Sequence, residues 1–377
     1  MNCRPDKMAQ GGRAFARVDG KVTFIDGALP GELVEVEILK RRKDFDEARV
    51  LRVLEPNPGR VDPPCPHYAR CGGCNLQHAG IDLQRLIKRQ VVNELFGRIA
   101  KIPLPSDWPL HGGEPLGYRR RARFVQGSRG WGFREEGSHA VEPVRSCPVL
   151  CSPLQKILET LPVLARDSEV QCFADSTEAV GIWNQDKPNS SLPIQIIKIL
   201  GKPLQADARV FFQSNFEMAE VLVSAVRDEL VHHPGAGKFS VDFFSGVGVF
   251  AAFLQDHFER VVAVEWNPGC LAHARKNLGS RCEFMSESAE EFLAGQIPQS
   301  LDFLVVDPPR SGLSPEVRQA LLQARPRRMA YVSCDPATLA RDVGEFVRNG
   351  WKLERLDGFD FYPQTDHLEM LAVLVPG

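Results

Sequence analysis

Cys334 stands where its thiol could act as a nucleophile. It follows the apolar run 329–333 and comes just before residues 335–339, which are predicted to start a helix. The carboxyl ends of strands are where open α/β sheets bind ligands, and a helix N-terminus makes a thiol more acidic. A thiolate beside a second reactant suggests covalent catalysis. Because most unpaired cysteines are small core residues, the neighbouring motifs must decide between the two roles.

The segment 242–248 contains glycines that suit a nucleotide-type site. It follows a predicted strand and opens a helix, and its glycines let the backbone turn tightly against a bound nucleoside. Glu265 ends the next predicted strand, 17 residues beyond Gly248, where a carboxylate can accept hydrogen bonds from ribose hydroxyls. Gly246, Gly248 and Ala251 also fit the loose dinucleotide fingerprint, so this motif alone leaves NAD and S-adenosylmethionine about equally open.

Two acidic residues favour S-adenosylmethionine over NAD. Asp242 lies four residues before the first glycine, an acidic position typical of methyl-donor sites. Asp307 ends a later strand, and the two prolines after it impose a stiff loop that would hold Asp307 toward the cofactor crevice. An ordinary turn is the alternative for this motif. A hydride-transfer enzyme would not need Cys334 in its position, whereas a methyl donor carries its own electrophile and the thiol can activate the acceptor.

A compact group of cysteines in the first half of the chain predicts a metal site. Three residues have the spacing C-x5-C-x2-C, and glycines ease the bend: Cys65, Cys71 and Cys74. A fourth ligand must come from elsewhere, and the candidates, the best one first, are Cys147, Cys151, His67 and His78. Four thiolates suit either zinc or an iron–sulfur cluster, and the spacing does not distinguish the two.

Composition and charge indicate a globular protein with a basic front half. The 377-residue chain is 43% apolar and 25% charged, and its length suggests two or three domains. Its net charge is only −2, but residues 1–150 carry 25 Lys and Arg against 18 Asp and Glu, which fits a polyanion-binding module. No apolar stretch of roughly 18 residues and no signal-peptide core is present. We therefore expect a cytoplasmic protein whose cysteines are reduced thiols or metal ligands.

The patterns along the chain predict three domains. Residues 1–58 are typical of a small β-barrel of the oligonucleotide-binding kind, with a basic cluster at 40–43 that could follow a phosphate backbone. Residues 59–205 form a mixed α+β region with the cysteines, and its arginine-rich run 118–124 is a candidate RNA contact. Residues 206–377 predict a doubly wound α/β sheet. Its strands are expected at 239–243, 261–264, 303–306, 329–333, 352–361 and 370–374.

Together these motifs resemble the family of S-adenosylmethionine-dependent RNA (uracil-5-)methyltransferases. The resemblance covers nearly the whole chain, and the motifs occur in the family's order: a TRAM-like barrel, then 71–78, 211–215, 242–248, 307–312, 333–342 and 366–369. The most similar subgroup modifies 23S ribosomal RNA and carries a [4Fe–4S] cluster. Two departures stand out. Val249 replaces an asparagine that some relatives have, and the short stretch before Gly11 puts the first strand of the barrel in doubt.

The resemblance implies roles for particular residues. The implied ligands of the cluster are Cys65, Cys71, Cys74 and Cys147. The implied contacts of the methyl donor are Gln213, Phe244, Glu265 and Asp307. Cys334 would attack C6 of the uracil ring, C5 would take the methyl group, and Glu369 would be the base that removes the C5 proton. Without the resemblance, Glu369 would be interpreted as a solvated acid at the start of a strand.

The implied substrate is an unpaired or flipped-out uridine in RNA, most closely in 23S ribosomal RNA, with transfer RNA as the alternative. We expect a monomer with no membrane and no obligate protein partner. One rival interpretation is an NAD-linked iron–sulfur oxidoreductase. Another is an RNA-binding module with a decayed catalytic domain, although the intact set of Cys334, Glu369, Gln213 and Asp307 argues against it. A cytosine C5 methyltransferase would also use a cysteine, but the Asp-Pro-Pro-Arg motif at 307–310 resembles the uracil enzymes.

Overall fold

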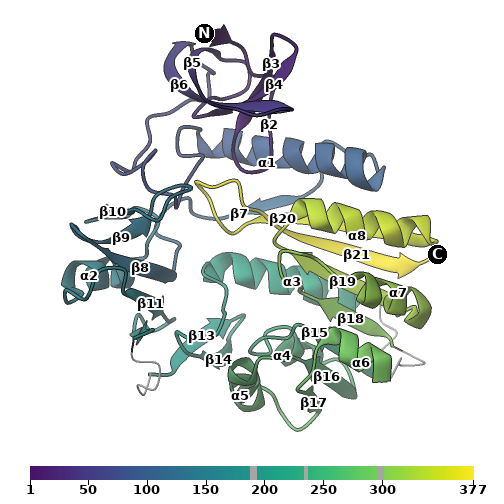
Figure 1. Ribbon diagram of the computed structural model, residues 1–377. Coiled ribbons are helices and arrows are strands. Elements are labelled where there is room, and N and C mark those ends of the chain that lie inside the picture. Colours follow the sequence, from purple (N-terminus) through teal and green to yellow (C-terminus); the bar gives the residue numbers. More distant parts are fainter. Residues whose placement is uncertain (187–192, 233–236, 296–300) are drawn as a thin grey trace.

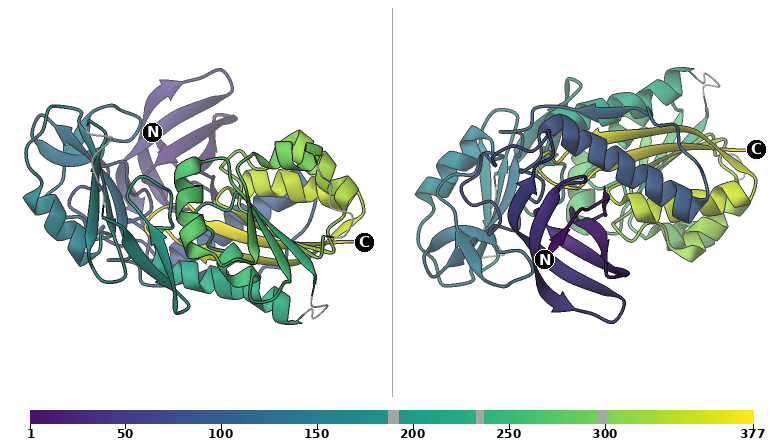
Figure 2. Two further views of the ribbon diagram at one scale, coloured as in Figure 1. Left: turned by 90° about the horizontal axis from the view of Figure 1, so that it is seen from below. Right: turned by 90° about the horizontal axis from the view of Figure 1, so that it is seen from above.

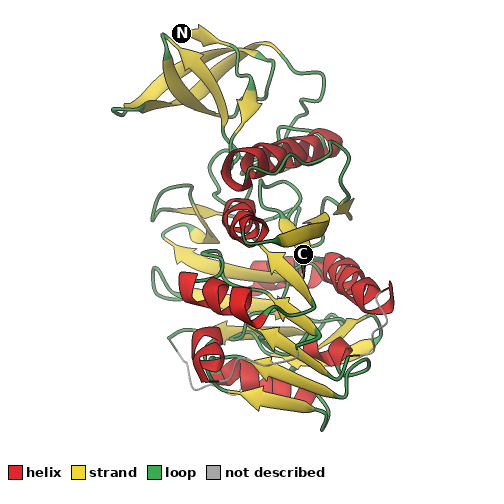
Figure 3. Cartoon of the chain, turned by 90° about the vertical axis from the view of Figure 1, so that its right-hand side faces the viewer, coloured by secondary structure: helices red, strands yellow, loops and turns green. Residues whose placement is uncertain are grey.

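The computed structural model describes residues 1–186, 193–232, 237–295 and 301–377. A small β-barrel lies at one end of the molecule, and helix α1 (Ile81–Leu95) runs beneath it (Figure 1). A large α/β domain fills the other end, and a smaller antiparallel sheet stands beside it (Figures 1 and 3). Among the described helices, none combines the length and the apolarity that a membrane span requires.

The N-terminal barrel is a six-stranded sheet with the order β1-β5-β6-β4-β3-β2. Its strands are β1 (Asn2–Cys3), β2 (Lys7–Met8), β3 (Ala14–Val18), β4 (Lys21–Asp26), β5 (Leu33–Arg41) and β6 (Phe45–Glu55). Inward and outward side chains alternate, so that Ala14, Ala16 and Ile25 are buried in the barrel core. The first strand that the sequence left in doubt is present in short form, because β1 pairs with β5 and β2 pairs with β3.

The region that lies between the barrel and the α/β domain in the sequence is built on a five-stranded antiparallel sheet and a separate two-stranded hairpin. The order of the five-stranded sheet is β10-β9-β8-β11-β12. Its strands are β8 (Arg121–Gly127), β9 (Gly130–Arg134), β10 (Val141–Pro143), β11 (Glu169–Ala174), β12 (Val180–Asn184), β13 (Gln195–Ile199) and β14 (Lys202–Ala206). Helix α2 (Ser152–Thr160) covers one face of the sheet, where Leu154 packs among Phe124 and Cys172.

Part of the same stretch of sequence packs against the α/β domain instead. Helix α1 continues into a π-helical turn, η1 (Phe96–Ala100), and Phe96 is fully buried in the core on one face of the large sheet. The short strand β7 (Leu110–Gly112) joins the edge of that sheet, parallel to β20 (Trp351–Asp360).

The α/β domain contains an eight-stranded sheet with the order β17-β16-β15-β18-β19-β21-β20-β7. Its remaining strands are β15 (Phe239–Phe243), β16 (Arg260–Val264), β17 (Cys282–Met285), β18 (Phe303–Val306), β19 (Arg328–Ser333) and β21 (Glu369–Pro376). Its helices are α3 (Phe216–His232), α4 (Ala251–Leu254), α5 (Pro268–Asn277), α6 (Ala289–Gly295), α7 (Pro315–Ala324) and α8 (Pro336–Arg348). The strands predicted from the sequence are confirmed to within one or two residues.

Apolar cores on both faces of the sheet explain why its strands are nearly continuous apolar runs. Val305 and Val332 belong to the core on one face, while Leu304 and Tyr331 belong to the core on the other. The β-barrel and the doubly wound sheet confirm those two parts of the predicted fold class. Because β15, β16, β18 and β19 are parallel, their carboxyl ends meet at one edge, where ligands bind in such sheets.

Candidate active site

Cys334 is the first of the two residues between the end of β19 and the start of α8. The next residue, Asp335, caps the helix, because its Oδ1 accepts hydrogen bonds from the backbone N–H groups of Ala337 and Thr338, both at 2.9 Å. Ser333 Oγ accepts a hydrogen bond of 3.2 Å from the Asp335 N–H. These local bonds fix the turn that presents the thiol at the sheet edge.

The loop after Asp307 is tied to the same helix. Thr338 Oγ1 donates to the Arg310 carbonyl at 3.2 Å, and Arg341 donates to the Ser311 carbonyl at 2.9 Å. Gly312 has φ +72°, and a side chain there would come within 2.7 Å of Arg341 and Asp342. The close approach explains the glycine and locks the loop that carries Asp307 and Arg310 against α8.

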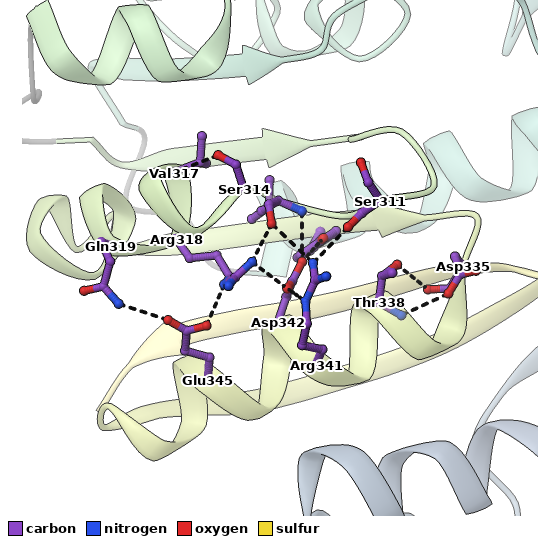
Figure 4. Close-up of polar contacts among 12 residues, drawn as sticks. Ser311, Ser314, Val317, Arg318, Gln319, Asp335, Thr338, Arg341, Asp342 and Glu345 are labelled. Carbon is purple, nitrogen blue, oxygen red and sulfur yellow. Dashed lines mark hydrogen bonds and ion pairs between the residues drawn. The ribbon is translucent and has the colours of Figure 1, made fainter.

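Asp342 makes most of the polar contacts that hold this loop against α8, and sequence reasoning assigned it no role of its own. Its carboxylate accepts hydrogen bonds from the Leu313 N–H at 2.9 Å and the Tyr331 hydroxyl at 2.7 Å. The Arg341 and Arg318 guanidinium groups pair with its other oxygen at 2.7 and 3.2 Å (Figure 4). A buried acid with this many partners holds the loop and the helix as one unit.

Glu369, at the first position of β21, lies close enough to Cys334 for their charges to interact. Its side chain is 4% exposed, and Oε2 has no hydrogen-bond partner among the described residues. Burial, and secondarily the Asp307 charge, raises the pKa of Glu369 to about 8, while Arg310 opposes the rise. Burial also raises the pKa of Asp307 to about 7. The strand end therefore holds carboxyls that can exchange a proton near neutral pH.

The expectation that the helix N-terminus makes Cys334 more acidic is wrong for this ligand-free site. Burial, followed by the charges of Glu369 and Asp307, raises the pKa of the thiol to about 12, and Arg310 only partly opposes this. The local helix effect is smaller than the combined cost of burial and two nearby acids. A positive charge bound beside these acids would lower the pKa again.

Most of the predicted cofactor residues lie around one pocket near the carboxyl ends of the strands. Gln213, Phe244 and Asp307 line a single pocket beneath the glycine turn. Phe244 has φ +61°, a left-handed conformation that is strained for such a residue and typical of functional sites. Glu265 directly follows β16 and accepts hydrogen bonds from the Gly246 N–H at 3.0 Å and the Asn267 N–H at 2.7 Å, so it braces the turn from the next strand.

Unpartnered polar atoms show that this pocket suits a polar ligand. Gln213 Oε1 and Ser245 Oγ, which belong to residues lining the pocket, are buried without a hydrogen-bond partner among the described residues, and so is Oδ1 of Asp242 near the end of β15. Asp242 Oδ2 accepts from the Ala251 N–H at 2.9 Å, and burial raises the Asp242 pKa to about 8. Native proteins rarely leave such groups unsatisfied, and a bound nucleoside offers hydroxyl and amino donors for them.

A second cavity, of about 340 Å³, is lined by Cys334 itself. Its walls come from the β2–β3 loop of the barrel, from Asn75, from α1 and from the loops around Arg310 and His367. Gln10 donates to Asp335 Oδ2 at 3.0 Å, and Asn75 donates to Asp366 Oδ1 at 2.8 Å. The barrel therefore lies directly against the catalytic loops.

Lys88 on α1 is a site residue that sequence reasoning missed. Its ammonium group is buried and donates to Asp360 Oδ1 at 2.6 Å and to the His367 carbonyl at 2.9 Å. These bonds hold the segment that leads directly into Glu369. A lysine on the buried face of an amphipathic helix was the only local signal for this role.

The four predicted metal ligands line one small pocket, together with Phe133 of the central sheet: Cys65, Cys71, Cys74 and Cys147. Burial, and secondarily the neighbouring thiols, raises the pKa of Cys71 to about 11 and that of Cys74 to about 12. Across the described ranges, no group of three or more His, Cys, Asp or Glu side chains has the arrangement of a metal site.

The alternative fourth ligands lie elsewhere. His67 Nδ1 is 2.9 Å from Glu142 Oε1, and His78 Nδ1 is 2.5 Å from the Tyr68 hydroxyl. Cys151 is buried in the core beneath α2. None of the three alternatives lines the cysteine pocket, whereas Cys147 does.

Several side chains of the arginine-rich run 118–124 make contacts within the protein. Tyr118 is buried and donates to the Pro363 carbonyl at 3.0 Å. Arg120 and Arg121 lie 5.0 and 4.6 Å from the rings of Phe216 and Phe173. Tyr118 and Arg120 therefore contact the α/β domain, whereas Arg121 contacts β11 of its own sheet. These three side chains are not free to carry the predicted RNA contact.

Two family models match the chain. The model described as tRNA (Uracil-5-)-methyltransferase matches residues 159–375, and the TRAM domain model matches residues 6–51. The chain is 33% identical over 425 residues to a 23S rRNA (uracil(1939)-C(5))-methyltransferase of Pseudomonas entomophila, covering 99% of this chain and 93% of that protein. It is 30% identical over 402 residues to an uncharacterized RNA methyltransferase of Treponema denticola, covering 97% of each.

Among solved structures, the chain is similar to the tRNA (uracil-54, C5)-methyltransferase of Pyrococcus abyssi in complex with S-adenosyl-L-homocysteine. The TM-score is 0.77 and the identity 23%, and the match covers 100% of this chain and 99% of that one. At this identity the likeness establishes a shared fold.

Proposed function

Because the chain belongs to the tRNA (uracil-5-)-methyltransferase family, we propose that it transfers a methyl group from S-adenosylmethionine to C5 of a uridine in RNA. The observation that carries this proposal is the place of Cys334. Cys334 lines the cavity that faces the barrel, and the charges of Glu369 and Asp307 reach its thiol. Asp307 also lines the pocket that contains Gln213 and Phe244. The uridine that accepts the methyl group and the S-adenosylmethionine that donates it would come together next to the sulfur atom of Cys334.

The residues of the chain divide the chemistry between them. The thiolate of Cys334 forms a bond to C6 of the uracil ring, which makes C5 an enolate-like nucleophile. When bound, S-adenosylmethionine would supply the methyl group that C5 accepts and would leave as S-adenosylhomocysteine, and its sulfonium charge would lower the pKa values of the nearby acids and thiol. Glu369 then takes the proton from C5, the C6–sulfur bond breaks, and Cys334 leaves as a thiolate.

Residues of the chain are also available to hold the methyl donor and to set the charge around Cys334 and Glu369. Gln213, Phe244, Glu265 and Asp307 are the residues that we propose to hold the methyl donor, since three of them line its pocket and Glu265 braces the glycine turn. Arg310 is the cation that opposes the raised pKa values of both Cys334 and Glu369. Its loop is fixed to α8, so this charge stays in place during the reaction.

We propose that the substrate is 23S ribosomal RNA and that the protein acts on it as a monomer in the cytoplasm. This proposal is supported by the relatives named for that RNA, which the chain matches over almost its whole length. Transfer RNA is the alternative, because the family model and the Pyrococcus structure are named for it. The NAD-linked oxidoreductase has no comparable support, since the family models and relatives that match are methyltransferases.

For the cysteine pocket we propose a [4Fe–4S] cluster held by Cys65, Cys71, Cys74 and Cys147. The donor chemistry supports it, because four thiols share one small pocket and four thiolates are the usual ligands of such a cluster. Zinc is the alternative. Iron and sulfide content with Mössbauer spectra of anaerobically purified protein should show the cluster, and Cys74→Ser should lose it while Cys172→Ser keeps it. Zinc in place of iron would overturn the assignment.

The function is tested with unmodified transcripts of 23S ribosomal RNA and of transfer RNA. We expect S-adenosylmethionine-dependent formation of 5-methyluridine in the ribosomal transcript, measured by mass mapping, and none with Cys334→Ala. Methylation of the transfer RNA alone would move the substrate to the alternative. Methylation at a position other than C5, or of neither RNA, would contradict the proposed activity.

A further inference from the structure

The outer face of the barrel carries an aromatic strip where polar residues are expected. Phe15 and Phe24 are directly paired across β3 and β4, with ring centroids 6.2 Å apart, and Phe24 meets Phe45 at 5.5 Å. The buried barrel core is formed by their sequence neighbours, such as Ala14 and Ile25. A one-sided barrel sheet normally exposes polar side chains on its outer face, so three half-exposed phenylalanines require an explanation.

The strip faces a groove of about 510 Å³ between the barrel and α1. Phe15, Phe24 and Val22 form its barrel wall, and Val91 and Arg98 belong to its helical wall. Figure 2 shows the barrel lying over α1 when the molecule is seen from above. The groove is therefore lined by apolar rings on one side. On the other side lies a helix end where Glu94 pairs with Lys7 and Arg98 has no ion pair among the described residues.

The groove continues into the cavity that contains Cys334. Both spaces are lined by Ala9, Gln10 and Val91, and Ala337 of the groove follows Pro336 of the cavity. A strand of RNA whose uridine enters the cavity must leave it in some direction. This groove offers a direct path away from the thiol.

The charges around the strip fit a polyanion. Arg98 at the groove is exposed and forms no ion pair with any residue that the structure describes. Phe45 follows the hairpin between β5 and β6, where Lys40 and Lys43 are exposed and likewise unpaired within the described part of the chain. A phosphate backbone can run from the groove toward this hairpin while its bases face the rings.

We propose that Phe15 and Phe24 form a stacking site for a nucleobase adjacent to the target uridine. Barrels of the oligonucleotide-binding kind stack unpaired bases on aromatic side chains, and every base has a face suited to this contact. The inference rests on the proposed function, because it takes the substrate to be a single-stranded segment of RNA. It gives the barrel a defined task, which is to hold the strand beside the uridine that enters the cavity.

The test compares two probes and two variants. The probes are a short oligouridine and an oligomer of equal length that lacks the bases, and binding is measured by fluorescence anisotropy over a range of salt. We expect Phe24→Ala to weaken binding of the oligouridine by roughly 5- to 150-fold, to leave binding of the abasic oligomer unchanged, and to keep the salt slope. Leu39→Ala, which removes an exposed apolar side chain of β5 outside the groove, should bind both probes as the wild type does.

Two further measurements separate stacking from a general defect. Photocrosslinking with 5-iodouridine should map to Phe15 or Phe24. On the RNA that the wild type methylates, Phe24→Ala should raise KM and leave kcat nearly unchanged, because the site holds a base that does not react. Three results would overturn the inference. They are unchanged oligouridine affinity in Phe24→Ala, an equal loss of affinity in Leu39→Ala, and a Phe24→Ala variant that loses self-association of the protein but not RNA binding. A wild type that methylates no RNA would instead count against the proposed function.

Discussion

Asp342 and Glu369 are both buried acids of the α/β domain, but their surroundings are opposite. The Asp342 carboxylate is fully enclosed and accepts hydrogen bonds from Leu313, Tyr331 and Arg341. Glu369 has an oxygen without a partner among the described residues and a pKa raised to about 8. The first acid is satisfied and holds structure in place, whereas the second is left free to move a proton.

The comparison shows how to separate structural from reactive acids in the same core. Burial alone does not distinguish them, because both side chains are nearly inaccessible. The number of partners does, since unsatisfied buried groups persist mainly where function requires them. Neutral substitutions at the two positions should therefore have different consequences, the first on folding and the second on turnover.

The largest effect is expected from Glu369→Gln. Loss of the base should lower turnover by about 10²- to 10⁴-fold, while the RNA remains attached to Cys334 because the C5 proton is not removed. The melting temperature should stay the same or rise, since a neutral amide replaces a buried acid. Single-turnover kinetics with gel analysis of the adduct measure both steps. Normal turnover in this variant would show that another group is the base.

Asp342→Asn should chiefly reduce stability. The change removes one of the two carboxylates that pair with the buried Arg318 guanidinium and leaves only Glu345. Breaking a buried pair typically costs about 3–5 kcal/mol of unfolding free energy. Urea unfolding measures the loss. The matched control is Glu283→Gln, which breaks the exposed pair with Arg260 and should cost about 1 kcal/mol or less. Equal losses in the two variants would contradict the structural role of Asp342.

Stability should fall as the pH rises from about 4.5 to 8. Burial raises the pKa of Glu369 to about 8, so the folded chain keeps a proton that the unfolded chain has lost, and Asp242 and Asp307 act in the same direction. Each such group contributes up to about 1.4 kcal/mol per pH unit within its window. Urea midpoints across this range measure the slope, and Glu369→Gln should reduce it. A slope of opposite sign would show that these acids are ionised in the folded chain.

The smallest effect is expected from Asp335→Ala. The change removes the cap of α8 and should cost about 1 kcal/mol of unfolding free energy. Because Asp335 is next to Cys334, turnover should also fall while the affinity for S-adenosylmethionine is kept. Asp335→Asn retains a capping side chain and should restore most of both properties. If the asparagine variant is as impaired as the alanine variant, capping is not the role of Asp335.

The strands and their carboxyl-end motifs could be predicted because their signals are local. Apolar runs give β16, β18 and β19, and the residues that follow each run reach the same edge of the sheet. The strand β7 could not be predicted, since Leu110–Gly112 has no pattern and joins the sheet only through β20. The interpretation of Tyr118 as an RNA contact failed for the same reason, because its partner, Pro363, is distant in sequence.

The electrostatics of the site were the least predictable part. The position of Cys334 before a helix suggested an acidic thiol, but burial and the acids at positions 307 and 369 outweigh the helix. The role of Lys88 likewise depends on Asp360 and on the His367 carbonyl, which only the fold brings to α1. Local sequence gives the residue types of the site, and tertiary contacts give their charges.

The central claim is that Cys334 bonds covalently to the uracil ring during methylation. The most direct test is incubation with S-adenosylmethionine and RNA that carries 5-fluorouridine at the methylated position, where the fluorine cannot be removed as a proton is. We expect a stable RNA–protein adduct that peptide mapping assigns to Cys334 and that Cys334→Ala does not form. An adduct at another residue, or no adduct while the same protein methylates ordinary uridine, would contradict the account.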